Sequence, residues 1–176
     1  MRDTTKNLIL IKFNKLLETY PFEKLTVDII AKESGISKST FYRYFLDKYD
    51  VMNFSYKRLV DNLFDSPDCH SWREMFRHLA YASRVDSQRL KNAYDSAGIN
   101  SYSAYLYKYS YEAVRSVTLR SRGAELTPME ACRLSHFCYG TVGATREWVN
   151  GSFSLTDEEM ADALYEAMPE TLRDLW

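Results

Sequence analysis

The chain contains very few of the residues that usually form turns. Its 176 residues include 6 Gly and 4 Pro. An all-β fold joins many short strands and needs frequent turns, whereas a helical fold needs only short connections between long elements. The scarcity of Gly and Pro therefore predicts an all-α protein.

The composition is that of an ordinary folded domain. Hydrophobic residues make up 45% of the chain and charged residues 27%, which excludes disordered and collagen-like classes. A net charge of −1 argues against a general nucleic-acid coat protein. Residues 1–50 nevertheless carry nine Lys and Arg against seven Asp and Glu, a net of +2, and the rest of the chain has fourteen against seventeen, a net of −3. The basic bias lies at the N-terminus.

The cysteines and the apolar stretches indicate in which cellular compartment the protein is expected. Cys69, Cys132 and Cys138 are an odd number in a chain without a secretory signal, which predicts reduced thiols rather than a disulfide framework. The apolar stretch from Leu8 to Ile11 is far too short to span a bilayer. We therefore expect a cytoplasmic protein that does not contact membranes.

Apolar spacing and helix start and stop signals predict about nine helices. Thr127-Pro128-Met129-Glu130 is a strong start signal, with Thr as cap, Pro at the first helical position and an acid in the first turn. Thr156 and Glu159 have capping-box spacing. The predicted helices cover residues 4–19, 27–34, 38–45, 47–65, 71–85, 87–96, 101–120, 128–150 and 156–175.

Residues 26–45 have the pattern of a helix-turn-helix motif. Two short helices are joined by a tight turn that contains Gly35, and the second begins with small hydroxyl residues. Phe41 and Phe45 lie one turn apart and would fasten this second helix to the core. Its other side chains would then be free to enter a DNA major groove.

The remaining side chains of this motif are hydrogen-bond donors. Lys38 and Arg43 can donate to guanine edges or phosphates. The hydroxyls of Ser37, Thr40 and Tyr42 can donate to phosphate oxygens, as can exposed amides beside Thr26 and Lys48, where the neighbouring helices begin. These residue types predict contacts that set the register of the protein on DNA.

The run LTVDIIAKESGISKSTFYRYFLDKYDVM, within residues 6–52, resembles the DNA-binding domain of the TetR family. The order and spacing of the motif are preserved over some forty residues. The resemblance implies that a set of positions contacts double-stranded operator DNA. They are Thr26, Ser37, Lys38, Ser39, Thr40, Tyr42, Arg43, Tyr44 and Lys48.

The resemblance also implies a domain arrangement and a homodimer. Residues 1–50 would form the DNA-binding domain, the helix at 47–65 would connect, and residues 51–176 would bind an effector and dimerise. The helices at 128–150 and 156–175 would pair with those of a second copy, and the small residues Gly140, Gly143 and Ala144 would allow close approach. Residues 140–169 also resemble a TetR subgroup that includes the activator of bacterial dihydroxyacetone-kinase operons.

A small-molecule effector would need an apolar cavity with a few polar groups. The helix at 101–120 is dense in tyrosine, which suits such a cavity, but the same spacing is typical of core packing, and both interpretations stay open. The residues predicted to bind a ligand are Phe76, His78, Tyr81, Tyr102, Tyr105, Tyr109 and His136.

Metal, redox and catalytic sites are weakly supported. Cys132 and His136 share a helix face, but Cys138 points elsewhere and no close-spaced ligand pair accompanies them, so no metal site and no cofactor are expected. Cys69 lacks the neighbouring cysteine or positive cluster of a redox sensor. No nucleophile–base pair or carboxylate constellation stands at a recognisable spacing, so the protein is not expected to be an enzyme.

These observations converge on a transcriptional regulator. We expect a repressor that binds a palindromic operator as a homodimer and responds to a small molecule. The alternative is a TetR-fold co-regulator that acts by docking another protein. Sequence-specific DNA binding that is sensitive to salt would separate the two.

Overall fold

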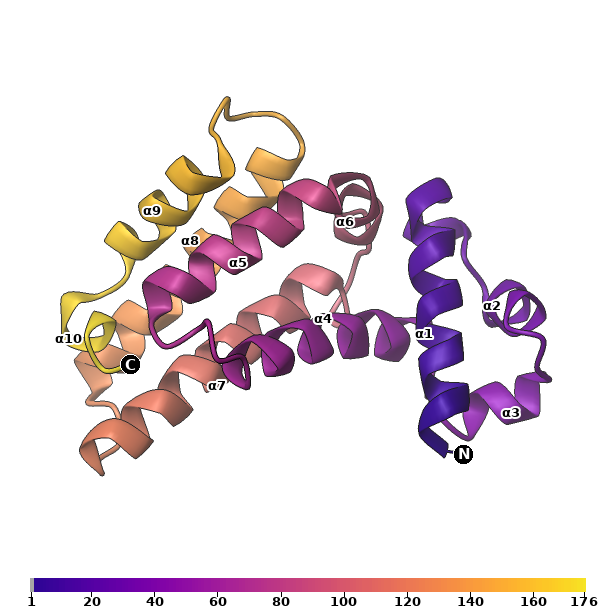
Figure 1. Ribbon diagram of the computed structural model, residues 1–176, viewed down its shortest axis with the longest axis horizontal. Helices are drawn as coiled ribbons and strands as arrows, with labels where there is room; N and C mark the ends of the chain where they lie inside the picture. Colours follow the sequence, from indigo (N-terminus) through magenta and orange to yellow (C-terminus); the bar gives the residue numbers. More distant parts are fainter. Residues whose placement is uncertain (1) are drawn as a thin grey trace. The chain divides into compact units, whose positions relative to one another are not determined.

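The computed structural model describes residues 2–176, with side chains from residue 4 onward. Over this range the chain forms ten α-helices, one 3-10 helix and no strand, which confirms the all-α prediction (Figure 1). The elements are α1 (Arg2–Thr19), η1 (Phe22–Lys24), α2 (Val27–Glu33), α3 (Lys38–Tyr42), α4 (Lys48–Phe64), α5 (Trp72–Val85), α6 (Ser87–Tyr94), α7 (Tyr102–Arg122), α8 (Pro128–Val149), α9 (Asp157–Ala167) and α10 (Glu170–Arg173).

The helices group into two compact units. Unit 1 comprises the chain up to Leu59 together with Ser87–Tyr105, and unit 2 comprises Val60–Asp86 together with Leu106–Trp176. The long helices α4 and α7 each contribute residues to both units. Helix α4 spans residue 50, as expected for the connecting helix at 47–65, and the predicted division into residues 1–50 and 51–176 stays a prediction.

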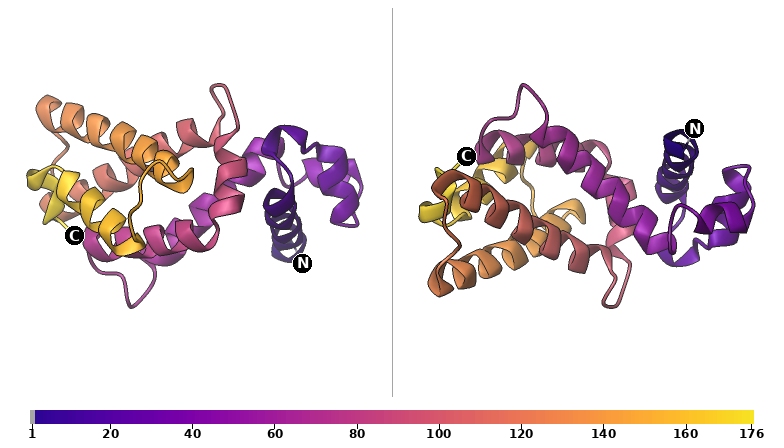
Figure 2. Two further views of the ribbon diagram at one scale, coloured as in Figure 1. Left: turned by 90° about the horizontal axis from the view of Figure 1, so that it is seen from above. Right: turned by 90° about the horizontal axis from the view of Figure 1, so that it is seen from below.

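Unit 1 is built around α1. Helices α2 and α3 lie on one side of α1, and α6 packs against it (Figures 1 and 2). Phe13, Phe22 and Phe41 are fully buried in this core. The buried Asn92 side chain of α6 donates a hydrogen bond of 2.6 Å to the carbonyl of Leu17 at the end of α1, so α6 satisfies a carbonyl that the helix itself leaves without a partner.

Unit 2 contains α5 packed along α9, a pair that is plain in Figure 1. Arg73 and Arg84 of α5 form ion pairs with Asp162 and Asp157 of α9, at 2.5 and 3.1 Å. On its apolar side α5 places Phe76 against Phe137 of α8, with ring centroids 6.1 Å apart. Burial of apolar side chains therefore holds α5 against α8, and exposed ion pairs lie along the contact between α5 and α9.

Helices α8 and α9 both begin at the predicted threonine caps, and each cap is part of a capping box, which the sequence analysis predicted for Thr156. The Thr127 hydroxyl accepts from the backbone amide of Glu130, and Thr156 does the same for Glu159, with the glutamate of each pair bonding back to the threonine amide. Glu130 also receives both terminal guanidinium nitrogens of Arg122, at 2.7 and 2.8 Å. The Arg122 and Thr127 hydrogen bonds lower the pKa of Glu130 to about 2.

The last predicted helix is not continuous. The expected helix at 156–175 breaks because α9 ends at Ala167 and Met168 adopts an extended backbone, with α10 starting at Glu170. Pro169 causes the break, since proline lacks an amide hydrogen and disfavours helical geometry in the residue before it. None of the described helices is long and apolar enough to cross a membrane.

Candidate nucleic-acid interface

The turn between α2 and α3 has the geometry that the motif requires. Gly35 has a φ of +65°, a left-handed conformation that glycine adopts without strain. The Gly35 amide donates to the carbonyl of Lys32, and the Ile36 amide donates to that of Ala31, which together form a Schellman ending for α2. This turn fixes the direction in which α3 leaves α2.

Hydroxyl residues cap the starts of both helices. Thr26 accepts from the Ile29 amide at 3.3 Å, and Ser37 accepts from the Thr40 amide at 3.1 Å. The Ser37 hydroxyl also lies 2.9 Å from the hydroxyls of Ser39 and Thr40. Thr26 and Ser37 therefore initiate helices. Their hydroxyl oxygens accept the capping hydrogen bonds, so a contact with DNA would use the hydroxyl hydrogens as donors.

Two aromatic side chains hold α3 to the core. Phe41 is completely buried and Phe45 is 2% exposed. Their ring centroids are 6.0 Å apart, and Phe45 in turn lies 5.7 Å from Phe54 of α4. The Lys6 ammonium of α1 lies 3.8 Å from the centre of the Phe54 ring, a cation–π contact. The buried side of α3 is thus rigidly packed, as the sequence predicted.

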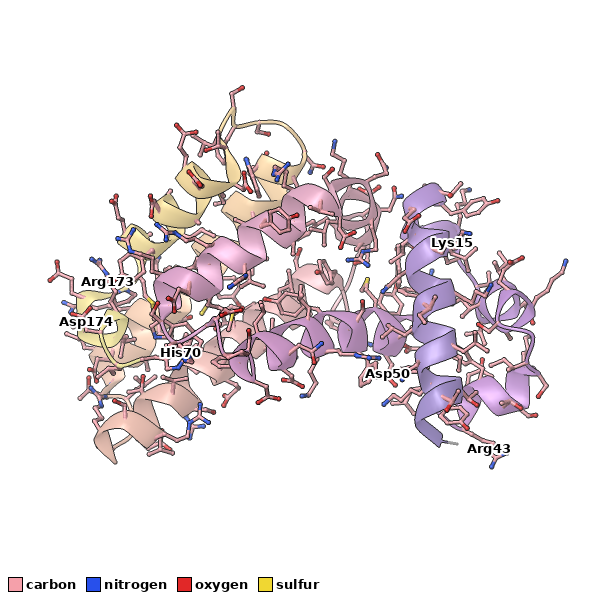
Figure 3. The ribbon with its side chains drawn as sticks, viewed as in Figure 1. Lys15, Arg43, Asp50, His70, Arg173 and Asp174 are labelled. Atoms are coloured by element: carbon pink, nitrogen blue, oxygen red, sulfur yellow. The ribbon has the colours of Figure 1, made fainter. Side chains whose placement is uncertain are left out.

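The opposite side of α3 is polar and open to solvent. Lys38, Ser39 and Arg43 are exposed, and Tyr42 is 56% exposed although its ring edge touches Phe41. Figure 3 shows the Arg43 side chain projecting away from the end of α3. The helix itself stops at Tyr42, three residues before the predicted end, so Arg43 stands at its last turn. This face presents cationic and hydroxyl donors together.

An acidic residue that the sequence analysis did not single out lies on the same face. Asp28, in the first turn of α2, forms an ion pair of 2.6 Å with the Lys38 ammonium, and both side chains are more than half exposed. Carboxylates are favourable at a helix N-terminus, which was the only available signal in the sequence. The pair neutralises one of the two cations predicted to contact DNA from α3.

Lys48 is engaged within the protein. Its ammonium donates to the carbonyls of Phe22 at 3.0 Å and Glu23 at 3.5 Å, and it lies 4.3 Å from the centre of the Phe22 ring. Burial lowers the pKa of Lys48, against the opposing effect of Glu23 and Asp47. The side chain therefore joins the start of α4 to η1, and a contact with phosphate would use its remaining hydrogen.

The nine predicted DNA-contacting residues all lie between the start of α2 and the start of α4, in unit 1. Five are exposed in addition to Tyr42, and Thr40, Tyr44 and Lys48 are half-buried. Short donor-rich side chains on a rigid helix can enter a major groove, and capping hydroxyls beside helix N-termini suit phosphates. Contact with DNA by each residue stays a prediction.

The seven predicted ligand-binding residues are divided between the two units. Tyr102 and Tyr105 belong to unit 1, where both rings meet Tyr56, at 6.0 and 6.4 Å. The other five belong to unit 2. Tyr109 of α7 donates a hydrogen bond to the Asp61 carboxylate, so its hydroxyl is held in place.

The remaining four occupy different environments in unit 2. Phe76 is buried in the core. The His78 ring nitrogen lies 3.3 Å from the carbonyl of Asp68, and Tyr81 is 56% exposed beside Arg84. His136 is exposed on α8. Core packing accounts for Phe76, and ligand binding by the set stays a prediction.

Within a single chain, the cysteines show no feature of a metal or redox centre. Cys69 and Cys138 are buried and Cys132 is exposed, and all three are free thiols. Burial raises the pKa of Cys138 to about 12, and burial together with Glu74 raises that of Cys69. Within the described part of the chain, no three His, Cys, Asp or Glu side chains are grouped so that they could hold a metal ion.

Two family models match the chain. Residues 14–53 match the model described as bacterial regulatory proteins, tetR family, and residues 70–170 match the model described as transcriptional regulator C-terminal region, TetR type. The two matches cover the α2–α3 motif and most of unit 2. No curated protein sequence matches the chain significantly.

Several solved structures share the fold at low sequence identity. The dihydroxyacetone kinase operon activator DhaS superposes with a TM-score of 0.66 and 14% identity over 96% of each chain. A TetR transcriptional regulator from Rhodococcus sp. RHA1 gives 0.62 and 17%, over 99% of this chain and 97% of the other. NalD of Pseudomonas aeruginosa, the secondary repressor of the MexAB-OprM multidrug efflux pump, gives 0.57 and 14% over the whole of both chains.

Proposed function

Since this chain belongs to the TetR family of bacterial transcriptional regulators, we propose that it binds a palindromic operator as a homodimer and represses transcription until a small molecule binds unit 2. One observation carries the proposal. The α3 helix is fixed to the core by the buried Phe41 and exposes Lys38, Tyr42 and Arg43 on its other side. A packed helix with exposed donors is what direct base recognition requires.

The exposed side of α8 supports the dimer. Met129 and Tyr139 are 62% and 63% exposed there, although both are large and apolar or aromatic. Gly140 and Gly143 lie on the same side, and a Cβ atom added at either would meet nothing within 4 Å. A helix surface that combines large apolar side chains with glycines is suited to packing closely against a second copy.

We propose repression as the sign of regulation on physical grounds. A dimer bound over a promoter blocks it without further contacts, whereas activation needs an additional surface for the polymerase. The fold does not decide the sign of regulation, because an activator, DhaS, and a repressor, NalD, share it. A promoter–reporter fusion that carries the operator settles the matter: deletion of the protein should raise expression, and a fall would reverse the proposed sign.

The central experiment selects bound sequences from a random duplex library. We expect an enriched palindrome, whose affinity for the protein falls steeply with added salt. Arg43→Ala should weaken binding to that palindrome by about 1–3 kcal/mol, roughly five- to 150-fold. Lys15→Ala is the matched control, since Lys15 is an exposed cation on α1, far from Arg43 in Figure 3, and its loss should leave affinity nearly unchanged.

A different result would favour the alternative function. If no palindrome is enriched and the weak binding that remains disappears with salt for the wild type and both variants alike, operator recognition is contradicted. The protein would then act as a co-regulator that docks another protein.

A further inference from the structure

The exposed side of α8 carries a cysteine and a histidine one helical turn apart, the Cys132–His136 pair. Both residues are exposed, and the Cys132 thiol is free. Side chains at positions i and i+4 of a helix share one face, with Cβ atoms about 5–6 Å apart. Within the described part of the chain, neither side chain has a hydrogen-bond or ion-pair partner. The thiol and the imidazole are therefore both available to a ligand.

The pair points directly away from the protomer. Leu134 is fully buried and lies midway between the two residues in sequence. At 3.6 residues per turn, each of them is about 160° from Leu134 around the helix axis. Gly143 continues the same line about two turns beyond His136, and a Cβ atom added there would meet nothing within 4 Å. The pair therefore lies at the centre of the side of α8 that the proposed dimer would bury.

Contacts with α7 hold this part of α8 in place. Arg122 binds the buried Glu130 carboxylate through both terminal nitrogens. The Tyr107 hydroxyl lies 3.1 Å from that of Ser135, and the Tyr107 ring stacks on Tyr139 with ring centroids 3.8 Å apart. These contacts lie on either side of the pair in the sequence and leave it exposed. A helix that is fixed in this way orients ligand side chains before an ion binds.

One chain supplies only half of a metal site. Where the chain is described, no three His, Cys, Asp or Glu side chains are grouped so that they could hold a metal ion, in agreement with the sequence, from which none was expected. A symmetric dimer contact joins the same surface of both copies. Two pairs that face each other would provide two thiolates and two imidazoles, the tetrahedral ligand set of many structural zinc sites.

The charge of the completed site suits its surroundings. Two thiolates offset the two positive charges of Zn²⁺, and the imidazoles bind as neutral rings, so the site has no net charge. The exposed Arg133, next to Cys132 in the sequence, therefore faces a neutral site rather than an uncompensated cation. Calcium and magnesium ions prefer oxygen ligands, which the pair does not provide.

We propose that one Zn²⁺ ion binds across the two-fold axis of the dimer, ligated by Cys132 and His136 of one protomer and by the same two residues of a second copy. Each thiol releases its proton to solvent when it ligates the ion. The inference rests on the proposed function for the homodimer alone and needs neither operator nor effector. An ion that binds the dimer and not the separate chains makes dimerisation tighter.

The first test measures the number and the geometry of the bound ions. The reduced full chain is titrated without DNA with Zn²⁺ and, in a separate sample, with Co²⁺, whose visible absorption reports its ligands. We expect one ion per two chains and a Co²⁺ spectrum typical of tetrahedral coordination with thiolate ligands. One ion per chain, an octahedral Co²⁺ spectrum, or no binding at micromolar metal would overturn the proposal.

Variants connect the ion to the dimer. In sedimentation equilibrium, Zn²⁺ should tighten dimerisation of the wild type by about tenfold or more. Cys132→Ser/His136→Gln should abolish this effect and dimerise as well as the wild type in the presence of a chelator. His70→Gln is the matched control and should keep the full effect, because His70 is an exposed histidine of unit 2 outside α8. If zinc still tightens the dimer of the double variant, the ion is held elsewhere and the proposed ligands are wrong.

The outcome is separable from that of the proposed function. Operator selection is carried out with a chelator present, and zinc binding is measured without DNA. A dimer that binds no zinc would refute the metal site and leave the homodimer intact. A dimer that binds zinc but enriches no palindrome would refute operator recognition and leave the site intact. A chain that stays monomeric with and without zinc would refute the homodimer, and the metal site with it.

Discussion

Two exposed helix faces of this protein differ in chemistry. The outer side of α3 in unit 1 carries a cation, hydroxyls and the exposed Tyr42 ring, and Phe41 is turned into the core. The outer side of α8 in unit 2 carries Met129, two glycines and Tyr139, whose ring stacks on Tyr107 of α7, together with the polar residues Arg133, His136 and Glu147. Both helices bury one side by the same rule of spacing. The exposed side of α3 consists of donors, whereas the exposed side of α8 mixes polar residues with large apolar side chains and glycines.

The difference shows that the exposed sides of the helices, rather than the buried sides, can differ according to function. Burial of one side of a helix specifies the architecture, and it leaves the composition of the other side free. Donor side chains suit a phosphate backbone and base edges, whereas glycines and apolar side chains suit another helix. The comparison can be tested by changing each side of each helix separately.

The largest effect should come from the buried side of α3. Phe41→Ala removes a fully buried ring and should lower the free energy of unfolding by about 3–5 kcal/mol. Tyr42→Ala, on the exposed side, should change it by less than about 0.5 kcal/mol and still weaken operator binding. Urea denaturation followed by circular dichroism measures the first quantity. Equal stability of the two variants would erase the distinction between the sides.

A slightly smaller effect is expected at the exposed side of α8. Gly140→Arg should weaken the proposed dimer by at least about 2 kcal/mol, roughly thirtyfold, because the new side chain occupies the space needed by the partner. The protomer has room for it, so folding should not suffer. Sedimentation equilibrium measures the dimer. Gly140→Ala is the control, and should raise the free energy of unfolding by about 0.5–1 kcal/mol.

A gain of affinity is expected from Asp28→Asn. The substitution removes a carboxylate from the donor face and frees the Lys38 ammonium, and should raise DNA affinity by about three- to tenfold at low salt. Protein stability should change little, because exposed ion pairs contribute at most about 1 kcal/mol. Fluorescence anisotropy with the selected operator measures the change. Unaltered affinity would mean that Lys38 does not contact the DNA.

The last effect concerns the segment that joins α7 to α8 and depends on pH. The pKa of Glu130 is lowered from 4.5 to about 2 in the folded chain, so its ionised form stabilises the fold above pH 4.5, and this contribution is lost as the pH falls toward 2. Wild type should therefore unfold at higher urea concentration than Glu130→Gln at pH 7, and the gap should close by pH 2. A gap that stays constant with pH would show that ionisation of Glu130 is not involved.

Features encoded by neighbouring residues were predictable from the sequence. The helix cap at Thr127, the capping box at Thr156 and the turn at Gly35 depend on a few adjacent residues, and the structure has them where the sequence predicted them. The break at Pro169 was missed because apolar residues continue beyond it at helical spacing, as far as Leu172. There the local rule for proline prevails over periodicity.

Features that join distant segments were not predictable. The Asp28–Lys38 pair depends on the angle between α2 and α3, which the spacing of residues does not encode. A cavity in unit 2 is assembled from α4, α7 and the last residues of the chain, and only Tyr109 among its lining was anticipated. The face of α3 could be predicted because a single short segment contains all of it.

The short length of α3 limits how many base pairs the helix could contact directly. Five helical residues span about 7.5 Å, or roughly two base-pair steps. With flanking residues included, two copies of the protein would each contact about three base pairs. Each base pair is one of four possibilities and so supplies two bits of information, which gives about twelve bits in total. To distinguish one site from about a million competing sites takes roughly twenty bits. If the protein binds an operator as the proposed dimer, the remaining specificity would come from DNA outside the bases that α3 contacts, through the bending and groove width of the intervening base pairs.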